Sequence, residues 1–496
     1  MLNYVIFDNQ IKVWWDYIKL EKDKVYSVFL DGKKIDEIKA TNFSFKNLKP
    51  NTSYEIAIQI GDAIVGKDIV KTNKRKRKID ITKAPYNAVG DGKTLNTASI
   101  QKAIDDCKEG ECVFIPKGVY LSGALFLHSD MELLLDKKAV LQGTSNPDDY
   151  PKIASRFEGI EDECYSSIIN VGVMDKSKGY TCENVVIRGG TIFGGGNALR
   201  KNIIEKEKAF FQELYRKTGA TEQEVLSNYD YNFTFPGRKR GRCMQVSNTR
   251  NFILADCICG MSPSWNLHFI YSKDIITCGC QVLSHGIANG DGWDPDSSIN
   301  CILFDTILDT GDDCVAIKSG KNPEGNEINR SCEHIKVFDV VANGGWGVAI
   351  GSEMSGGVND VKLWNLNMKK TSVGFYIKAP IERGGYVKNV ELKNSSAPRV
   401  SISQKSMYNP SGDDATTPSV VENITLEDLY LGGIDYFDSG KHDWFAISID
   451  SKDDYKGLIN NVSISDILLN RRNLKPNQEF YFKNVSGIKL KNIKSK

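Results

Sequence analysis

Short runs of alternating apolar and polar residues recur from about residue 79 to the C-terminus. Each run opens on a turn-type or polar position, continues with β-branched or apolar residues, and often leads into Asn or Asp. The runs begin at Asn184, Asp274, Cys301, His334, Asp360, Asn389, Asn423, Asn461 and Gly487. From residue 274 onward, successive starts are 27, 33, 26, 29, 34, 38 and 26 residues apart.

An irregular period of this length, with strands and no helices between them, predicts a solenoid of β-coils. A single coil cannot bury its own apolar side chains, but stacked coils share one interior, and Asn or Asp at the corners can satisfy turn backbone. A β-propeller would need a longer period with four strands in each blade. We therefore expect an all-β chain with a parallel β-helix over residues 79–496.

Two segments interrupt the β pattern. Residues 98–107 have the apolar spacing of a helix, which could cap the open end of the solenoid and shield an exposed sheet edge. Residues 198–225 predict a helical insertion, which could form a wall over a cleft.

The first 75 residues predict a separate small β-sandwich. Short alternating runs recur there, and Asp31-Gly32 between two of them is a hairpin signal. The segment 48–54, which ends at Tyr54, resembles the tyrosine corner of fibronectin type III domains, in which the Tyr hydroxyl bonds to upstream backbone. The basic run 74–78 that follows is interpreted as a solvated linker, with an anionic-substrate or nucleic-acid patch as the alternative.

Composition excludes several function classes. The 64 basic and 63 acidic side chains give a formal charge of +1, whereas a dedicated nucleic-acid binder has a strong basic excess. No apolar stretch approaches the length that spans a bilayer, so no membrane association is expected. The N-terminus lacks the features of a signal peptide, which favours a cytoplasmic protein unless a signal was removed. The sequence gives no indication of the oligomeric state.

The twelve cysteines do not determine the compartment. Cys257, Cys259, Cys278 and Cys280 form two C-x-C pairs, interpreted as small buried side chains on successive coils rather than a metal or redox site. Cys107 and Cys112 could form a disulfide across a short loop or remain reduced.

The densest acidic pattern comprises Asp291 in 289–297 and the pair Asp312–Asp313 in 311–320. Asp291 and Asp312 are 21 residues apart, about one coil, so the three carboxylates should meet on neighbouring parallel strands about 4.8 Å apart. Crowded carboxylates raise at least one pKa, and glycoside hydrolysis needs one protonated and one ionised carboxyl. A Ca²⁺ site and ordinary turn chemistry are the alternatives at this point.

These segments resemble the signatures of glycoside hydrolase family 28, the polygalacturonases. The family's N-T-D reads Asn289-Gly290-Asp291 here, and its second motif reads Gly311-Asp312-Asp313. The flanking segments 294–297 and 350–357 also resemble those of the family. Segments 116–120 and 264–268 resemble the family in their type of sequence. The resemblance covers residues 85–490, and exo-acting bacterial members carry a fibronectin-like domain in front, which fits residues 1–75.

The resemblance implies a right-handed parallel β-helix and hydrolysis of a galacturonic-acid glycosidic bond with inversion. By the same resemblance, Asp312 is the general acid, while Asp291 and Asp313 hold and deprotonate the attacking water. No metal and no cofactor are implied. Within the matching phrases, Asn289 and Glu353 are candidate substrate contacts.

Two family signatures are altered. The G-H-G position reads Gly345-Trp346-Gly347, and Trp346 could stack on a sugar face or fill space in a closed site. The R-I-K position reads Tyr376-Ile377-Lys378, so the Arg that would bind a carboxylate in bidentate fashion is absent.

Other side chains could compensate for these changes. Lys318 and Arg383 are candidate carboxylate contacts or solvated surface charges. His285 is a candidate stand-in for the missing histidine, although a lone His is more often structural.

We expect an exo-acting galacturonosidase whose partner is a pectic oligosaccharide or polysaccharide. The altered signatures keep open a rhamnogalacturonan- or xylogalacturonan-directed hydrolase of the same family. A pectate lyase, which would need Ca²⁺ and a basic residue, and a non-catalytic sugar-binding β-helix are the alternatives of another class.

Overall fold

The computed structural model describes residues 1–21, 24–177, 179–218, 239–405, 412–432, 444–470, 474 and 477–496, with the backbone alone for 209–218. The chain divides into two compact units. The first is Met1–Lys78 with Gly110–Cys112, and the second is Ile79–Glu109 with Val113–Lys496.

The first unit is a β-sandwich of two antiparallel sheets. Its three-stranded sheet contains β1 (Asn3–Ile6), β2 (Gln10–Trp14) and β5 (Asn42–Lys46), and its four-stranded sheet contains β4 (Lys33–Ile38), β3 (Tyr26–Leu30), β6 (Ser53–Ile60) and β7 (Ala63–Lys71). Trp15, Val28 and Ile58 are buried in the core of this unit. The Lys49 N–H donates to the Tyr54 hydroxyl at 2.8 Å, which is the tyrosine-corner bond that the sequence predicts. The fibronectin type III-like sandwich is confirmed.

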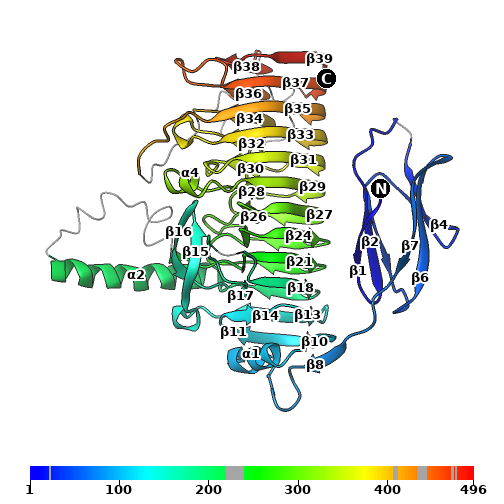
Figure 1. Ribbon diagram of the computed structural model, residues 1–496, viewed down its shortest axis with the longest axis vertical. Helices are drawn as coiled ribbons and strands as arrows, with labels where there is room; N and C mark the ends of the chain where they lie inside the picture. The colour runs from blue at the N-terminus through cyan, green and yellow to red at the C-terminus, as the bar shows by residue number, and fades with distance from the viewer. Residues whose placement is uncertain are drawn as a thin grey trace. The chain divides into compact units, whose positions relative to one another are not determined.

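The second unit is a parallel β-helix, as Figure 1 shows. One eleven-stranded sheet contains β12 (Leu125–Leu127), β17 (Ile169–Val171), β20 (Met244–Ser247), β23 (Leu267–Ile270), β26 (Trp293–Asp296), β28 (Val315–Ile317), β30 (Gly347–Gly351), β32 (Gly374–Lys378), β34 (Arg399–Ser403), β36 (Ile447–Asp450) and β38 (Phe480–Lys483). This sheet positions the candidate site.

The remaining solenoid strands form a nineteen-stranded sheet. It contains β8 (Arg77–Asp80), β9 (Asp91–Leu95), β10 (Glu111–Ile115), β11 (Gly118–Ser122), β13 (Glu132–Leu135), β14 (Ala139–Gly143), β18 (Cys182–Arg188), β19 (Thr191–Phe193), β21 (Thr249–Ala255), β22 (Ile258–Gly260), β24 (Lys273–Cys278), β25 (Gln281–Leu283), β27 (Ile299–Asp309), β29 (Cys332–Ala342), β31 (Val358–Asn367), β33 (Tyr386–Ala397), β35 (Val420–Leu431), β37 (Ile459–Leu469) and β39 (Ile488–Ser495). Strands β24 and β25 both pair with β27, so one long strand replaces two short ones from that coil onward.

The polar residues that open the sequence runs form the corners of the coils. Asn389, Asn423 and Asn461 all adopt positive φ, between 53° and 61°, a conformation that Asn tolerates better than most residues. Their side chains form a ladder, since Asn423 donates to Asn389 at 3.0 Å and Asn461 donates to Asn423 at 2.6 Å. The repeated phrase therefore sets both the bend of each coil and the bond to the next.

Apolar side chains from every coil share one continuous interior. All twelve cysteines are buried thiols, so Cys107 and Cys112 form no disulfide. Cys257 and Cys259 lie in this interior, as the reading of small buried side chains predicts, and burial raises the pKa of both thiols well above the ordinary value. A protonated buried thiol is inert, which fits a packing role.

Helix α1 (Thr97–Asp105) lies at the N-terminal end of the stack and buries Ile100, Ala103 and Ile104 in the interior (Figure 1). Helix α2 (Gly196–Thr218) forms most of the predicted insertion, and residues 219–225 of that prediction lie outside the described residues. The short helices η1 (Pro147–Asp149), α4 (Glu324–Ile328) and η3 (Ile381–Arg383) lie between strands of the second unit.

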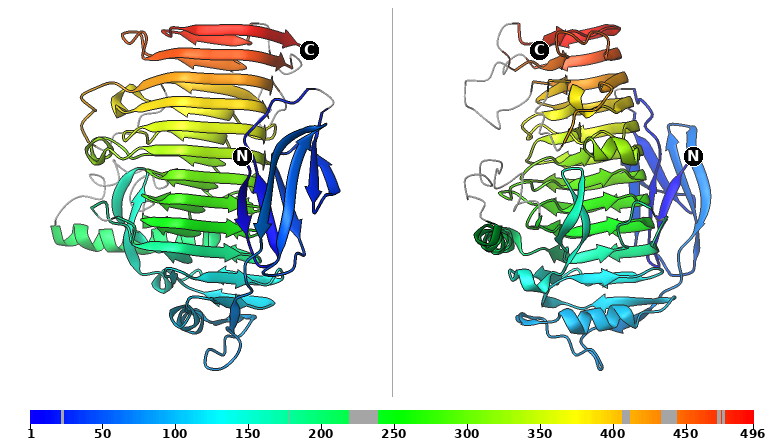
Figure 2. Two further views of the ribbon diagram at one scale, coloured as in Figure 1. Left: turned by 45° about the vertical axis from the view of Figure 1, so that its right-hand side comes forward. Right: turned by 60° about the vertical axis from the view of Figure 1, so that its left-hand side comes forward.

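The sequence analysis did not predict the hairpin of β15 (Lys152–Phe157) and β16 (Ile160–Tyr165). It is an antiparallel pair that runs beside the stacked strands (Figure 2). Its turn uses Glu158 and Gly159, both at positive φ. A Cβ at Gly159 would lie 2.7 Å from the Lys321 nitrogen, so the close approach of the turn to that coil requires glycine.

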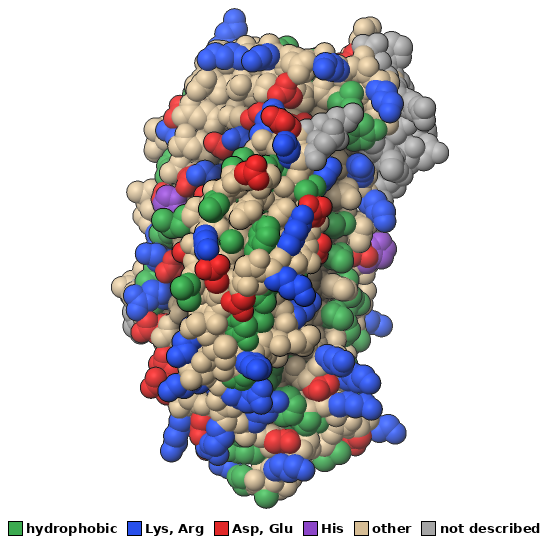
Figure 3. Space-filling view, turned by 90° about the vertical axis from the view of Figure 1, so that its right-hand side faces the viewer, with side chains coloured by type: hydrophobic (Ala, Val, Ile, Leu, Met, Phe, Trp, Pro, Cys, Tyr) green, Lys and Arg blue, Asp and Glu red, His purple; other side chains and the backbone are tan. Residues whose placement is uncertain are grey.

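Basic and acidic side chains are interspersed on the face of the molecule drawn in Figure 3, in keeping with the balanced composition. Over the described part of the chain, none of the helices combines the length and the apolar character that a bilayer crossing requires.

Candidate active site

The register of the eleven-stranded sheet brings two of the predicted catalytic aspartates side by side. Trp293 pairs with Val315, so Asp291 and Asp313, each two residues upstream, stand opposite one another. The Gly292 N–H donates to the Asp313 carbonyl at 2.9 Å and fixes this alignment. Asp291 and Asp313 are buried, whereas Asp312 is partly exposed. The spacing of one coil therefore brings the three carboxylates together, with Asp313 rather than Asp312 in register with Asp291.

The three carboxyls differ in their electrostatic surroundings. Burial raises the pKa of Asp312 well above its ordinary value, and the charges of Asp291 and Asp313 raise it further. Burial also raises the pKa of Asp313, to about 6, although the Lys378 ammonium 3.0 Å from its Oδ2 lowers it. The site can therefore keep a proton on Asp312 while ionised carboxylates lie beside it, the division of roles that acid–base hydrolysis of a glycoside needs.

Lys318 lies among three carboxylates. Its Nζ is 3.3 Å from Asp291 Oδ2, 3.6 Å from Glu353 Oε2 and 3.9 Å from Asp294 Oδ1. Burial alone would lower the pKa of Lys318, but these carboxylates, Glu353 foremost, raise it well above its ordinary value. Burial alone would likewise raise the pKa of Glu353, yet Lys318 and then Lys378 lower it to about 2. The sequence predicts that Lys318 and Glu353 contact substrate, and the structure places their charges against each other.

The two residues that replace family signatures occupy different positions. Trp346 is 43% exposed, and its backbone N–H donates to the Asp312 carbonyl at 3.1 Å, so the two residues are neighbours along the backbone of adjacent coils. Tyr376 is in the middle of β32, packed with Ala316 and Ala349, and the Lys378 ammonium lies 4.7 Å from its ring.

Three other predicted residues, Asn289, Arg383 and His285, have protein groups as their neighbours. The Asn289 side chain accepts a hydrogen bond from Arg240 at 2.7 Å. The expectation that Arg383 could be a solvated charge is wrong, because it is buried and donates to the Ser352 carbonyl at 3.1 Å and to Asn322 at 2.8 Å. The side chain of His285 is 68% exposed and is 3.8 Å from Asp309. Among the ion pairs of the described residues, His285 is paired with Asp309 and with none of the three aspartates.

A row of residues at equivalent positions on successive coils passes through two of the predicted catalytic aspartates. Register pairs Met244 with Leu267, Leu267 with Trp293 and Val315 with Val348. The residues two positions upstream therefore follow one another from coil to coil, and they are Arg242, Trp265, Asp291, Asp313 and Trp346.

The hairpin β15–β16 covers the N-terminal part of this row. Phe157 stacks on Trp265 with ring centroids 5.0 Å apart, and the Arg242 guanidinium lies 4.7 Å from both rings. Phe157, Trp265 and Arg242 are all almost fully buried. The stacked rings of Phe157 and Trp265 thus fill the row one coil before Asp291, whereas Trp346, one coil beyond Asp313, is exposed to solvent.

A buried ion pair fastens the hairpin to β26. Arg156 Nη1 donates to Asp296 Oδ1 at 2.9 Å and to Ser297 Oγ at 3.0 Å, and Asp296 Oδ2 is 3.4 Å from His268 Nε2. Burial lowers the pKa of His268 to about 4, so the imidazole is neutral near neutral pH. The sequence analysis did not identify Arg156 and Phe157, and the signal present there is Gly159, a turn-forming residue between two alternating runs.

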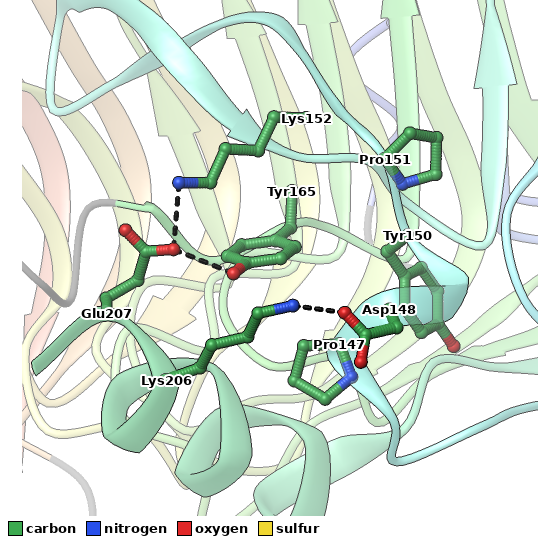
Figure 4. A pocket seen from close by; sticks show the side chains of 8 residues that line it. All are labelled: Pro147, Asp148, Tyr150, Pro151, Lys152, Tyr165, Lys206 and Glu207. Atoms are coloured by element: carbon green, nitrogen blue, oxygen red, sulfur yellow. Dashed lines mark hydrogen bonds and ion pairs between the residues drawn. The ribbon is translucent and has the colours of Figure 1, made fainter. Parts of the chain in front are cut away.

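Helix α2 supports the other end of the hairpin, at a pocket of about 300 Å³ (Figure 4). Glu207 accepts a hydrogen bond from the Tyr165 hydroxyl at 2.7 Å and pairs with Lys152 at 2.8 Å. Lys206 pairs with Asp148 across the same pocket. The charges that line this pocket thus compensate one another. The Glu207 contacts join α2 to the hairpin, and the Lys206–Asp148 pair joins α2 to η1.

Within the residues that the structure describes, no three His, Cys, Asp or Glu side chains are grouped to hold a metal ion. Between Asp291, Asp294 and Glu353, the positive charge is supplied by Lys318.

Comparisons with known proteins agree with this geometry. Residues 219–471, just over half of the chain, match the model of the glycosyl hydrolases family 28. The exo-poly-α-D-galacturonosidase of Dickeya chrysanthemi is 25% identical over 86% of this chain and 76% of its own length. A probable polygalacturonase of Vitis vinifera is 29% identical over 62% of this chain and 58% of its own length.

Two solved structures share the fold along most of their length. The family 28 exopolygalacturonase of Yersinia enterocolitica aligns with a TM-score of 0.75 at 23% identity, over 99% of this chain and 98% of that one. The exopolygalacturonase of Thermotoga maritima aligns with a TM-score of 0.66 at 25% identity, over 84% and 91% of the two chains. With the family model matched across the coils that carry the three aspartates, this chain is a glycoside hydrolase that belongs to family 28.

Proposed function

We propose that this hydrolase releases galacturonic acid from one end of pectic oligosaccharides, as an exo-polygalacturonase. The relatives named as exo-acting enzymes support this proposal. Membership of a hydrolase family also favours hydrolysis over the pectate-lyase and sugar-binding alternatives.

The observation that carries exo action is the asymmetry of the row through Asp291 and Asp313. On the N-terminal side, the stacked rings of Phe157 and Trp265 fill the next coil, about 4.8 Å away. On the C-terminal side, the indole of Trp346 is exposed. A chain end fits such a half-closed site, whereas the middle of a polymer would have to pass through the Phe157–Trp265 stack.

The chemistry follows from the division of charge. Asp312, kept protonated by burial and by its two acidic neighbours, donates a proton to the leaving glycosidic oxygen. Asp291 and Asp313 hold a water molecule, and the ionised carboxylate accepts its proton as the oxygen attacks the anomeric carbon. Attack by water in a single displacement inverts the anomeric configuration.

The product profile tests this function. Galacturonic acid oligomers of three to six residues should yield monosaccharide from the first minutes, with each remaining oligomer shortened by one residue. Mixed oligomers at early times would instead show internal cleavage and would contradict exo action.

The two replaced signatures favour a second candidate, a hydrolase directed to rhamnogalacturonan or xylogalacturonan. Tyr376 offers no charge to a substrate carboxylate, and Lys378 is already paired with Asp313. Rates on the three glycans in parallel would separate the candidates, because a better rate on a rhamnose-containing or xylose-substituted chain would select this second one.

A further inference from the structure

Lys318 connects three successive coils through its ammonium group. Asp291 and Asp294 belong to the coil of β26, Lys318 follows β28, and Glu353 follows β30. The ammonium lies 3.3 Å from Asp291 and 3.6 Å from Glu353, and 4.5 Å from the centroid of the Trp265 ring. Lys318 is only 4% exposed, so these groups define its surroundings more than solvent does.

The position of Glu353 is set by backbone as well as by charge. The Ser319 N–H donates to the Glu353 carbonyl at 2.7 Å, which aligns Glu353 with the residue that follows Lys318. The Glu353 side chain is 12% exposed, and its carboxylate faces the lysine from the coil opposite to that of Asp291. Glu353 is thus placed to act on Asp291 through Lys318.

We propose that Glu353 is a positioning residue that holds the Lys318 ammonium between two coils, shares its charge, and so preserves Asp291 as an effective base. This inference rests on the proposed function, since it assigns a role within the same reaction. Without the Glu353 charge, the ammonium would lose one of the carboxylates that share its charge and would act more strongly on Asp291, 3.3 Å away. A carboxylate beside a less compensated ammonium is a weaker base.

The direction of the effect follows from the charges around the pair. Lys318 faces Asp291, Asp294, Asp313 and Glu353, and Glu353 faces Lys318, Lys321, Lys378 and Arg383. Removal of one negative charge from this cluster stabilises the remaining carboxylates in their ionised form. Both the acidic and the basic limb of the rate profile should therefore move to lower pH.

The test is the pH profile of kcat on trigalacturonate for the wild-type chain, Glu353→Gln and Glu353→Asp. Glu353→Gln should shift both limbs down by about one pH unit and lower kcat roughly ten-fold, with KM unchanged. Glu353→Asp keeps the charge but withdraws it from Lys318, so a smaller shift in the same direction is expected. The matched control is Glu132→Gln. The Glu132 carboxylate is buried and pairs with Arg188 at 2.6 Å, on coils distant from the site, so this substitution should leave the pH profile unchanged.

Three outcomes would overturn the proposal. A raised KM with an unshifted profile would make Glu353 a substrate contact, and lower thermal stability with unchanged kinetics would make it structural. If Glu353→Gln does not fold, an unshifted profile in Glu353→Asp decides against the proposal in the same way.

Failure of the proposed function would be distinguishable. If the wild-type chain cleaves no pectic oligomer, the carboxyl titrations can be followed by ¹³C NMR of protein labelled at the aspartate carboxyl carbons. Glu353→Gln should then move at least one titration to lower pH while Glu132→Gln moves none. Unchanged titrations would refute the role of Glu353 without reference to activity.

Discussion

Asp294 and Asp296, two residues apart on strand β26, are both fully buried, yet their pKa values move in opposite directions. For Asp296, burial acts to raise the pKa, but Arg156 at 2.9 Å and His268 at 3.4 Å lower it below the ordinary value. For Asp294, burial and then the charge of Asp291 raise the pKa well above its ordinary value, and the Lys318 ammonium is 3.9 Å from its Oδ1.

The difference shows that the neighbouring charges of a buried carboxyl, rather than the extent of its burial, determine the direction of its pKa shift. At the end of β26, a satisfied ion pair fastens the hairpin and stabilises the fold. At its start, carboxyls are crowded together with too few partners, which keeps protons available for chemistry. The same strand therefore carries a structural pair and a reactive cluster about two residues apart.

The largest effect on activity is expected from the cluster of crowded carboxyls around Asp291, which includes Asp312. Asp312→Asn should lower kcat by at least about 10³-fold, because the amide cannot deliver a proton to the leaving oxygen. Thermal stability should not fall, since the substitution removes a crowded carboxyl. Asp309→Asn, next to exposed His285, is the control and should retain activity. Substantial activity in Asp312→Asn would move the acid role to another carboxyl.

For the buried pair of Arg156 with Asp296, the expected effect is on the stability of the fold. Arg156→Met leaves Asp296 buried without its guanidinium, which should cost about 3–5 kcal/mol of unfolding free energy in a urea titration. Arg188→Met, which breaks the more exposed pair with Glu132, should cost less. Equal losses of unfolding free energy in the two variants would mean that deeper burial does not increase the cost of breaking the Arg156–Asp296 pair.

The pH dependence of stability should follow the same structural pair. Asp296 has a lowered pKa in the fold, so its stabilising contribution is present above the unfolded pKa of 3.8 and is lost as pH falls below that value. His268 also has a lowered pKa, about 4 against 6.5, so the unfolded chain takes up its proton first on acidification. The melting temperature should therefore decrease between pH 6.5 and 4, and His268→Gln should flatten that part of the curve.

The acidic limb of the rate profile should report on Asp313. Its pKa of about 6 predicts that activity rises as pH increases through about 6, when the carboxyl ionises. Lys378→Met removes an ammonium that lowers this pKa, so the limb should move to higher pH. Lys388→Met, which breaks a pair with Glu422 on the other sheet, should not move it.

The smallest effect is expected at Trp346. If its exposed indole stacks on a sugar, Trp346→Ala should raise KM roughly two- to ten-fold with little change in kcat. His285→Ala should leave both constants unchanged, because the exposed imidazole lies against Asp309. An unchanged KM in Trp346→Ala would mean that the indole only fills space.

The parts of the molecule that depend on local sequence could be predicted. The coils follow from a repeated Asn or Asp at positive φ, and the tyrosine corner follows from a short turn around Tyr54. The meeting of Asp291 with Asp312 and Asp313 follows from a spacing of one coil, which the parallel register converts into proximity.

The parts that depend on distant contacts could not be predicted. Arg156 and Asp296 are 140 residues apart, and nothing in the hairpin sequence indicates which coil it covers. The contact of Lys318 with Glu353 likewise depends on the irregular length of one coil. Sequence alone therefore indicated Glu353 as a candidate substrate contact and Lys318 as a carboxylate contact or a solvated charge, and burial of Lys318 shows that the solvated alternative is wrong.

The central claim is that a half-closed site with Asp312 as its acid removes one galacturonic acid residue at a time. The most direct test follows trigalacturonate by ¹H NMR with the wild-type chain and Asp312→Asn. The account predicts free galacturonic acid, initially as the β anomer, alongside digalacturonate, and no release by the variant. Early formation of the α anomer, or cleavage that persists in Asp312→Asn, would contradict it.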